Sequence, residues 1–85
     1  MKVKLFTKDI ETMEFLQSNI YYYDIKKEII PVYNEDGTIR STCYILFDIS
    51  SIDYNKNDDL ISIYYKNIRF SIKTDNINDL IVDNK

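Results

Sequence analysis

Residues 31–49, PVYNEDGTIRSTCYILFDI, hold the pattern that decides the fold. The Asn-Glu-Asp-Gly run at 34–37 contains the only glycine of the chain, and glycine supplies the positive φ that closes a short hairpin. The strand after this turn is apolar on both faces at 44–47, which predicts a central place in its sheet. Pro31 removes a backbone donor from the strand before the turn, so we expect that strand at a sheet edge.

Before this hairpin the apolar residues have a helical period. Ile10, Met13 and Leu16 recur at intervals of three, which places them on one stripe of a helix. We expect the helix to begin at a cap formed by Thr7 and to end near Asn19.

After the hairpin the pattern predicts a loop, two more strands and a short helix. The polar run at 50–59 is typical of a long loop. A possible short C-terminal helix carries Ile77, Leu80 and Ile81. The expected strands of the whole chain are residues 2–6, 25–33, 38–49, 60–65 and 68–73, the last two joined by a turn at 66–67.

The composition favours a β-rich fold. The chain has 15 Ile, 8 Tyr and 4 Phe but no Ala and no Trp, and β-branched and aromatic residues suit a pleated, half-buried surface. Its 85 residues allow one domain, 1–85, which by size alone exposes about 5,300 Å². We predict an α+β fold with an antiparallel sheet of four to five strands and one helix packed on a face, in the order β-α-β-β-β-β.

The chain lacks the residues that most catalytic and metal sites need. It has no histidine, which removes the usual general base and the usual zinc ligand. Its one cysteine, Cys43, lies among apolar residues in mid-strand, where a thiol is normally an inert core residue. A chain with one glycine also has no glycine-rich phosphate loop. We therefore expect no enzyme activity, no cofactor and no metal.

One run resembles part of a calcium-binding loop. Asp53, Asn55 and Asn57 have the alternating spacing of the first three oxygen ligands. The position that needs Gly holds Asp58, and the twelfth position, which needs a bidentate Glu, holds Tyr64. We therefore interpret the run as a solvated turn.

The charge balance bears on partners. With 11 basic and 14 acidic side chains the net charge is −3, which repels a phosphate backbone and disfavours direct binding to nucleic acid. The two arginines, Arg40 and Arg69, leave a local site for single-stranded nucleic acid open as an alternative. No run of 18 apolar residues and no leader segment is present, so we expect no membrane contact and a cytoplasmic location.

Tyrosine and aspartate supply the candidate binding site. Two adjacent tyrosines of a strand cannot both face the core, and exposed tyrosine is frequent at protein interfaces. Aspartates near the loop and near the C-terminus would form one acidic face, able to imitate phosphates, if those two segments lay together. The candidate contacts combine acid with aromatic groups and are Tyr54, Asp58, Asp59, Tyr64 and Tyr65.

In size, acidity, AT-rich codon usage implied by composition and lack of catalytic residues, the chain resembles small phage-encoded anti-defence proteins, including anti-CRISPR inhibitors. The resemblance is one of general type and implies an inhibitor or adaptor that occludes a basic host nuclease or nucleic-acid-binding protein, in the host cytoplasm. A homo-oligomeric structural or regulatory subunit, joined through an exposed sheet edge, is the other alternative.

Overall fold

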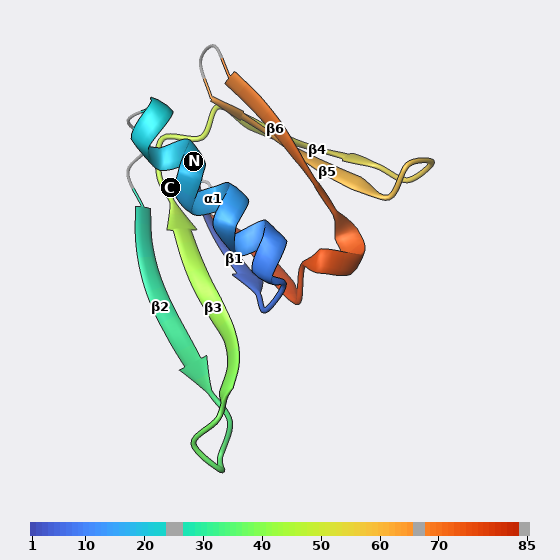
Figure 1. The fold of residues 1–85 in the computed structure, drawn as a ribbon. Coiled ribbons are helices and arrows are strands. Elements are labelled where there is room, and N and C mark those ends of the chain that lie inside the picture. Colours follow the sequence, from blue (N-terminus) through green and yellow to red (C-terminus); the bar gives the residue numbers. More distant parts are fainter. Residues whose placement is uncertain (24–26, 66–67, 84–85) are drawn as a thin grey trace.

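The computed structural model describes residues 1–23, 27–65 and 68–83. In these residues it shows one α-helix, one short 3-10 helix and seven strands, so the predicted α+β class is confirmed (Figure 1). The strands form two antiparallel sheets, one of four strands and one of three, where the sequence predicted a single sheet. The expected turn at 66–67 and the expected strand start at 25 lie outside the described residues.

The four-stranded sheet has the order β2-β3-β1-β7. The strand after the Gly37 turn is central and the strand that contains Pro31 is at the edge, so both predictions are confirmed. Gly37 has a φ of 89°, and its N–H donates to the carbonyl of Asn34 at 3.1 Å to close the hairpin. The strands are β1 (Lys2–Thr7), β2 (Lys27–Tyr33), β3 (Ile39–Leu46) and β7 (Asp79–Asp83).

The three-stranded sheet has the order β4-β5-β6. Its first strand lies within residues 50–59, where the sequence predicted a loop. Residues 51–55 form an antiparallel strand with β5, and only residues 56–59 form the turn. Ile52 alternates with polar neighbours and packs against the core. This alternation is a strand signal, but it is weak because most residues of the segment are polar. The strands are β4 (Ser51–Asn55), β5 (Leu60–Tyr65) and β6 (Ile68–Lys73).

A backbone kink at Asp48 separates the two sheets. Asp48 has a φ of 58°, a left-handed conformation that aspartate tolerates better than most residues. The next residue, Ile49, is held by the chain start, because its N–H donates to the Met1 carbonyl at 3.0 Å and its carbonyl accepts from the Met1 amino group at 3.1 Å. β3 therefore ends at Leu46, and the chain leaves the first sheet before Ser51.

The helix α1 (Ile10–Tyr23) is longer than predicted and is capped by a different residue. Asp9 is the cap, because its Oδ2 accepts from the backbone N–H and the hydroxyl of Thr12. Thr7 instead ends β1, and its hydroxyl donates to the Asn76 carbonyl at 2.6 Å. Ile10 is 67% exposed because it is the first helical residue, so its predicted place on the buried stripe is wrong.

The C-terminal segment is a strand, so the possible short helix carrying Ile77, Leu80 and Ile81 does not form. A single 3-10 turn, η1 (Thr74–Asn76), precedes β7, which pairs antiparallel with β1. A helix of so few residues is marginal in isolation, whereas the free edge of β1 offers this segment a complete row of backbone partners.

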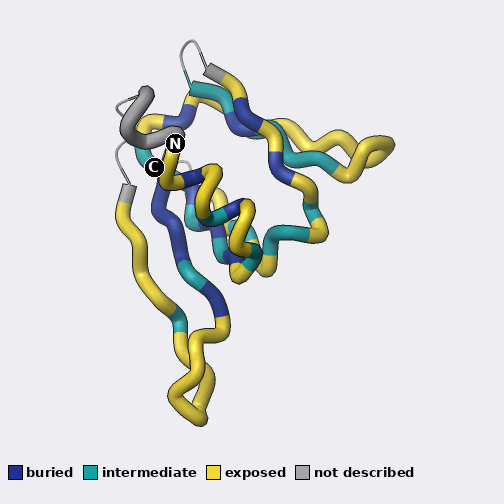
Figure 2. Tube along the Cα trace, viewed as in Figure 1, coloured by how far each residue is buried: buried dark blue, intermediate teal, exposed yellow. Residues whose placement is uncertain are grey.

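One core joins α1 and the two sheets (Figure 2). Ile63, Phe70 and Ile72 are buried and Ile61 is partly buried, all on the inward side of β5 and β6. The side chain of Ile68 lies outside the described residues. The buried members of the core are Val3, Leu5, Leu16, Tyr44, Leu46, Ile49, Ile63, Phe70 and Ile72.

Candidate functional site

The tip of the β4–β5 hairpin brings together three of the five predicted contacts, Tyr54, Asp58 and Asp59. All residues from 53 to 59 are exposed, and Tyr54 exposes half of its surface. Figure 1 shows this hairpin extending beyond the body of the molecule. The tip therefore presents one aromatic side chain close in sequence to two carboxylates on the same turn.

Hydrogen bonds within the turn fix the shape of this tip. The Asn55 side-chain oxygen accepts from the N–H groups of Asn57 at 3.0 Å and Asp58 at 3.3 Å. The Asn55 amide group donates to Asp58 Oδ2 at 3.0 Å. The Asp59 carbonyl accepts from the Thr74 N–H at 2.8 Å, which ties the base of the tip to β6. The run that resembles a calcium loop is thus a solvent-exposed strand end and turn.

Tyr64 and Tyr65 lie at the other end of β5 and on opposite faces of it. Tyr64 lies opposite Arg69, on the outer face, and is half-buried. Tyr65 packs inward, with its ring stacked on Phe70 at a centroid distance of 6.1 Å. Its hydroxyl is buried and has no hydrogen-bond partner among the described residues. The five predicted contacts therefore do not form one surface.

Burial also changes the acid–base behaviour of Tyr65. Loss of solvent raises the pKa of its hydroxyl above the usual value for tyrosine, and the nearby negative charge of Asp48 raises it further. The hydroxyl is therefore kept in its neutral form. We conclude that Tyr65 contributes to the core and not to an exposed contact.

The β2–β3 hairpin forms a second exposed tip that the sequence analysis did not single out. Residues 33–40 are all exposed, and Tyr33 lies opposite Ile39 across the two strands. These two side chains are 59% and 62% exposed. Glu35 and Asp36 lie in the turn between them. The turn itself was predicted. That the hairpin extends beyond the other elements depends on the tertiary fold, which a local sequence pattern does not determine.

The second tip is also held by its own hydrogen bonds. The Asn34 N–H donates to the Thr38 carbonyl at 2.7 Å, and the Asn34 side chain donates to the Thr38 hydroxyl at 3.0 Å. Asp36 accepts from the Thr38 hydroxyl at 2.6 Å and from the Thr38 N–H at 3.0 Å. These two bonds hold the pKa of Asp36 below its usual value, so its carboxylate stays charged.

The acidic residues are divided between the two sheets, although Asp75 of η1 follows Thr74, whose N–H donates to the Asp59 carbonyl. Asp79 and Asp83 belong to β7 of the four-stranded sheet, where Asp83 lies 3.8 Å from the Lys2 ammonium group. Asp58 and Asp59 belong to the β4–β5 turn of the other sheet. The arginines are likewise divided between the sheets, with Arg40 in β3 and Arg69 in β6, so no single sheet carries both.

One face of the four-stranded sheet lies outside the core that the described residues form, and we call it the uncovered face. Leu5 and Tyr44 lie opposite each other on the face that packs against α1, so their neighbours in β1 and β3 point to the other side. That side carries the row Ile30, Cys43 and Phe6 across three strands. Cys43 is buried there, and burial raises the pKa of its thiol, with a smaller opposing effect from Lys4. The thiol is therefore kept protonated.

Within residues 1–23, 27–65 and 68–83, no three His, Cys, Asp or Glu side chains are placed so that they could hold a metal ion. Within the same residues, no helix combines the length and the apolar character needed to cross a membrane. No protein-family model matches the chain, and neither a curated protein nor a solved structure matches it.

Proposed function

We propose that this protein is a non-catalytic binding protein, an inhibitor or adaptor, that engages a protein partner through its hairpin tips. One observation carries the proposal: two projecting tips each present an exposed tyrosine beside two carboxylates on a hydrogen-bonded turn. The first tip has Tyr54 with Asp58 and Asp59, and the second has Tyr33 with Glu35 and Asp36.

The physics of association supports this reading. A tyrosine side chain adds a large contact area and a hydroxyl at low entropy cost. The internal hydrogen bonds of both turns mean that little order has to be gained on binding. Carboxylates at the tip attract a basic surface over a distance of roughly 10 Å at moderate salt.

The partner that fits this chemistry is a basic protein. We infer that it is a nuclease or another nucleic-acid-binding protein, whose positive surface is occluded by the acidic tips. The net charge of −3 and the resemblance in general type to phage anti-defence proteins support this narrower form. Inhibition would then be stoichiometric, because the chain blocks a surface and converts no substrate.

The test is affinity capture with tagged protein from a lysate of the source organism or its host, at low and at raised salt. We expect one basic partner in near-equal amount, released by salt. The variant Asp58→Asn/Asp59→Asn removes two charges and keeps side chains that can hydrogen-bond, and it should retain about tenfold less partner.

The matched control is Glu14→Gln/Glu28→Gln, which removes the same charge from exposed positions outside both tips. It should capture the partner as the unchanged protein does. If the two double variants lose partner equally, net charge and not the tip explains binding. If neither loses partner, the proposed surface is wrong.

A second candidate function, a homo-oligomeric subunit, is favoured by the uncovered face of the four-stranded sheet. The chain exposes 6023 Å², compared with about 5,300 Å² for a compact protein of its mass. Ile30 and Ile81 are among the exposed apolar side chains on this face.

Substitutions at two neighbouring isoleucines distinguish this candidate function from the first. Ile30 is 45% exposed on the uncovered face, and Ile29 is 46% exposed on the opposite face of the same strand. If the chain self-associates through the uncovered face, Ile30→Lys should convert the oligomer to a monomer in light scattering, whereas Ile29→Lys should not. A monomer at high concentration without any substitution rules the candidate out.

A further inference from the structure

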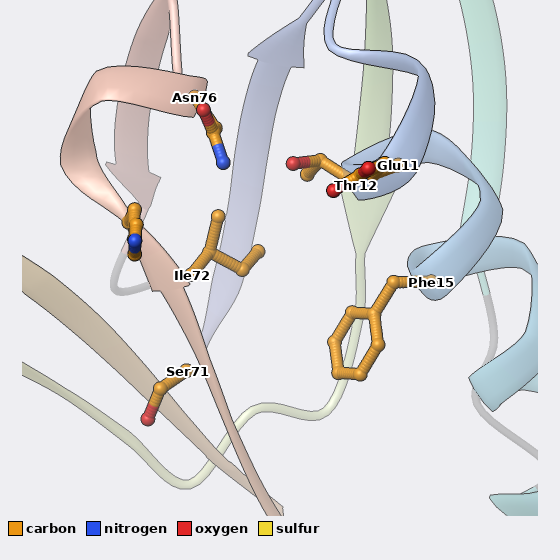
Figure 3. Close-up of a pocket in the computed structure, with 7 residues that line it drawn as sticks. Glu11, Thr12, Phe15, Ser71, Ile72 and Asn76 are labelled. Atoms are coloured by element: carbon orange, nitrogen blue, oxygen red, sulfur yellow. The ribbon is translucent and has the colours of Figure 1, made fainter.

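A groove lies between α1 and β6, and its lining contains no residue of either hairpin tip. Figure 3 shows Thr12 and Phe15 of the helix on one wall and Ile72 and Asn76 on the other. The groove has a volume of about 400 Å³. At one end Phe15 meets the ring of Phe70 edge-on at 5.6 Å. The space is thus bounded by a helix on one side and a strand on the other.

The strand wall is a sheet edge with which no strand of the described residues pairs. β6 is the last strand of the three-stranded sheet, and its other side pairs with β5. The Thr74 N–H donates to the Asp59 carbonyl. In an antiparallel pair every second residue directs its N–H and C=O toward the neighbouring strand, so Phe70 and Ile72 direct theirs toward β5. The N–H groups of Arg69, Ser71 and Lys73 and the C=O groups of Arg69 and Ser71 therefore point to the free edge, whereas the Lys73 carbonyl belongs to the N-cap residue of η1. Ser71 and Lys73 line the groove.

The side chains along this edge define what could pair with it. Ser71 lies on the outer face, where its hydroxyl is 2.8 Å from that of Ser62, so Arg69 and Lys73 lie on the same face. Both outer neighbours are basic and favour acidic side chains on an added strand. On the inner side the exposed ring of Phe15 and the buried Ile72 favour apolar side chains, and Glu11 on the helix wall disfavours acidic ones there (Figure 3).

We propose that this groove binds an extended segment of a protein partner, added as a fourth strand along β6, whose side chains alternate between acidic and apolar. A second copy of the chain fits less well. Antiparallel pairing of two β6 strands about Ser71 places Arg69 opposite Lys73 of the other copy, and like charges in that position are destabilising. The inference is independent of the hairpin tips, because it uses neither of them.

Lys73 allows a sharp test, because its φ of −65° and ψ of 135° match the backbone of proline. Lys73→Pro removes the N–H that points to the free edge and leaves the pairing with β5 intact. Lys73→Gln removes the same charge but keeps the N–H. The probe is a fluorescent seven-residue peptide that alternates Glu with Val, compared with one that alternates Lys with Val.

We expect the Glu peptide to bind the unchanged protein and Lys73→Gln, and to bind Lys73→Pro about tenfold more weakly, as loss of one backbone hydrogen bond implies. Hydrogen exchange should slow at the amides of Ser71 and Lys73 when peptide is bound. Melting curves of both variants verify that the fold is retained.

Three results overturn the inference. The first is equal binding of the Glu peptide to Lys73→Pro and Lys73→Gln. The second is protection from exchange at another edge, such as β2 or β7. The third is no binding of the Glu peptide at about 1 mM, an affinity too weak to support recognition. None of these results bears on the hairpin tips, so the two proposals fail separately.

Discussion

Tyr65 shows how one residue type serves opposite purposes along a single chain. Its ring stacks on Phe70 and its hydroxyl is buried, whereas Tyr54 of the neighbouring strand is half exposed. From the sequence, Tyr64 and Tyr65 could be assigned to opposite faces of a strand, which the structure confirms. Tyr65 shares the face of Ile61 and Ile63, because alternate residues of a strand point to the same side, and that face packs against the core.

We predict that Tyr65→Phe stabilises the protein by about 1 kcal/mol, because it removes a buried hydroxyl with no partner among the described residues and keeps the ring stack. The matched control is Tyr33→Phe, whose hydroxyl belongs to an exposed side chain and whose loss should be neutral. Urea unfolding of both variants at neutral pH gives the comparison. Destabilisation by Tyr65→Phe contradicts the assignment of an unpaired hydroxyl.

Tyr65→Phe should also change how the free energy of unfolding depends on pH above pH 10. The folded-state pKa of Tyr65 is raised above the unfolded value of about 10, so folding favours the protonated hydroxyl. This contribution is fully present below the unfolded pKa and is lost as the pH rises toward the folded pKa. Tyr65→Phe should therefore lose less stability above pH 10 than the unchanged protein.

At the level of single elements, α1 begins at a cap formed by Asp9, whereas the sequence pattern favoured Thr7. Thr7 and Asp9 are both good capping residues, and the pattern alone favoured the first. The strand β1 extends through Thr7, which leaves Asp9 in the position whose carboxylate reaches Thr12. The hydroxyl and the backbone N–H of Thr12 lower the pKa of Asp9 below its usual value.

We predict that Asp9→Ala lowers the melting temperature by a few degrees, because it leaves the Thr12 N–H without its acceptor. Asp9→Asn keeps an acceptor and should change the melting temperature much less at neutral pH. Because the folded pKa of Asp9 is lowered, its carboxylate stabilises the fold above the unfolded pKa, and this is lost as the pH falls through the folded pKa.

Melting curves from pH 7 down to pH 2 test this sign. The difference between the unchanged protein and Asp9→Asn should shrink toward zero as the pH falls. A difference that grows toward low pH contradicts the assignment of the ionised carboxylate as the cap.

The elements that could be predicted are those with a local signal. The Gly37 turn, the edge strand with Pro31 and the central strand β3 each follow from one residue type or one period. β4 and β7 could not be predicted in the same way, because each is short and largely exposed. Both strands form because a free edge, that of β5 or β1, offers backbone partners from distant parts of the chain.

At the scale of the whole molecule, the division into two sheets decides which candidate residues meet. The kink at Asp48 sends the β4–β5 hairpin away from the β2–β3 hairpin, and each ends in an exposed tip (Figure 1). Tyr54, Asp58 and Asp59 share one hairpin because they are close in sequence. Tyr64 and Tyr65 lie at the other end of β5 and on opposite faces of it.

The central claim is that the hairpin tips contact a protein partner, and a hydrogen-exchange footprint tests it most directly. Exchange is measured for the protein alone and with the partner recovered by affinity capture. We expect slower exchange at residues 53–59, with or without residues 33–40, and little change on the uncovered face of the four-stranded sheet. Protection confined to that face or to β6, with both tips unchanged, would contradict it.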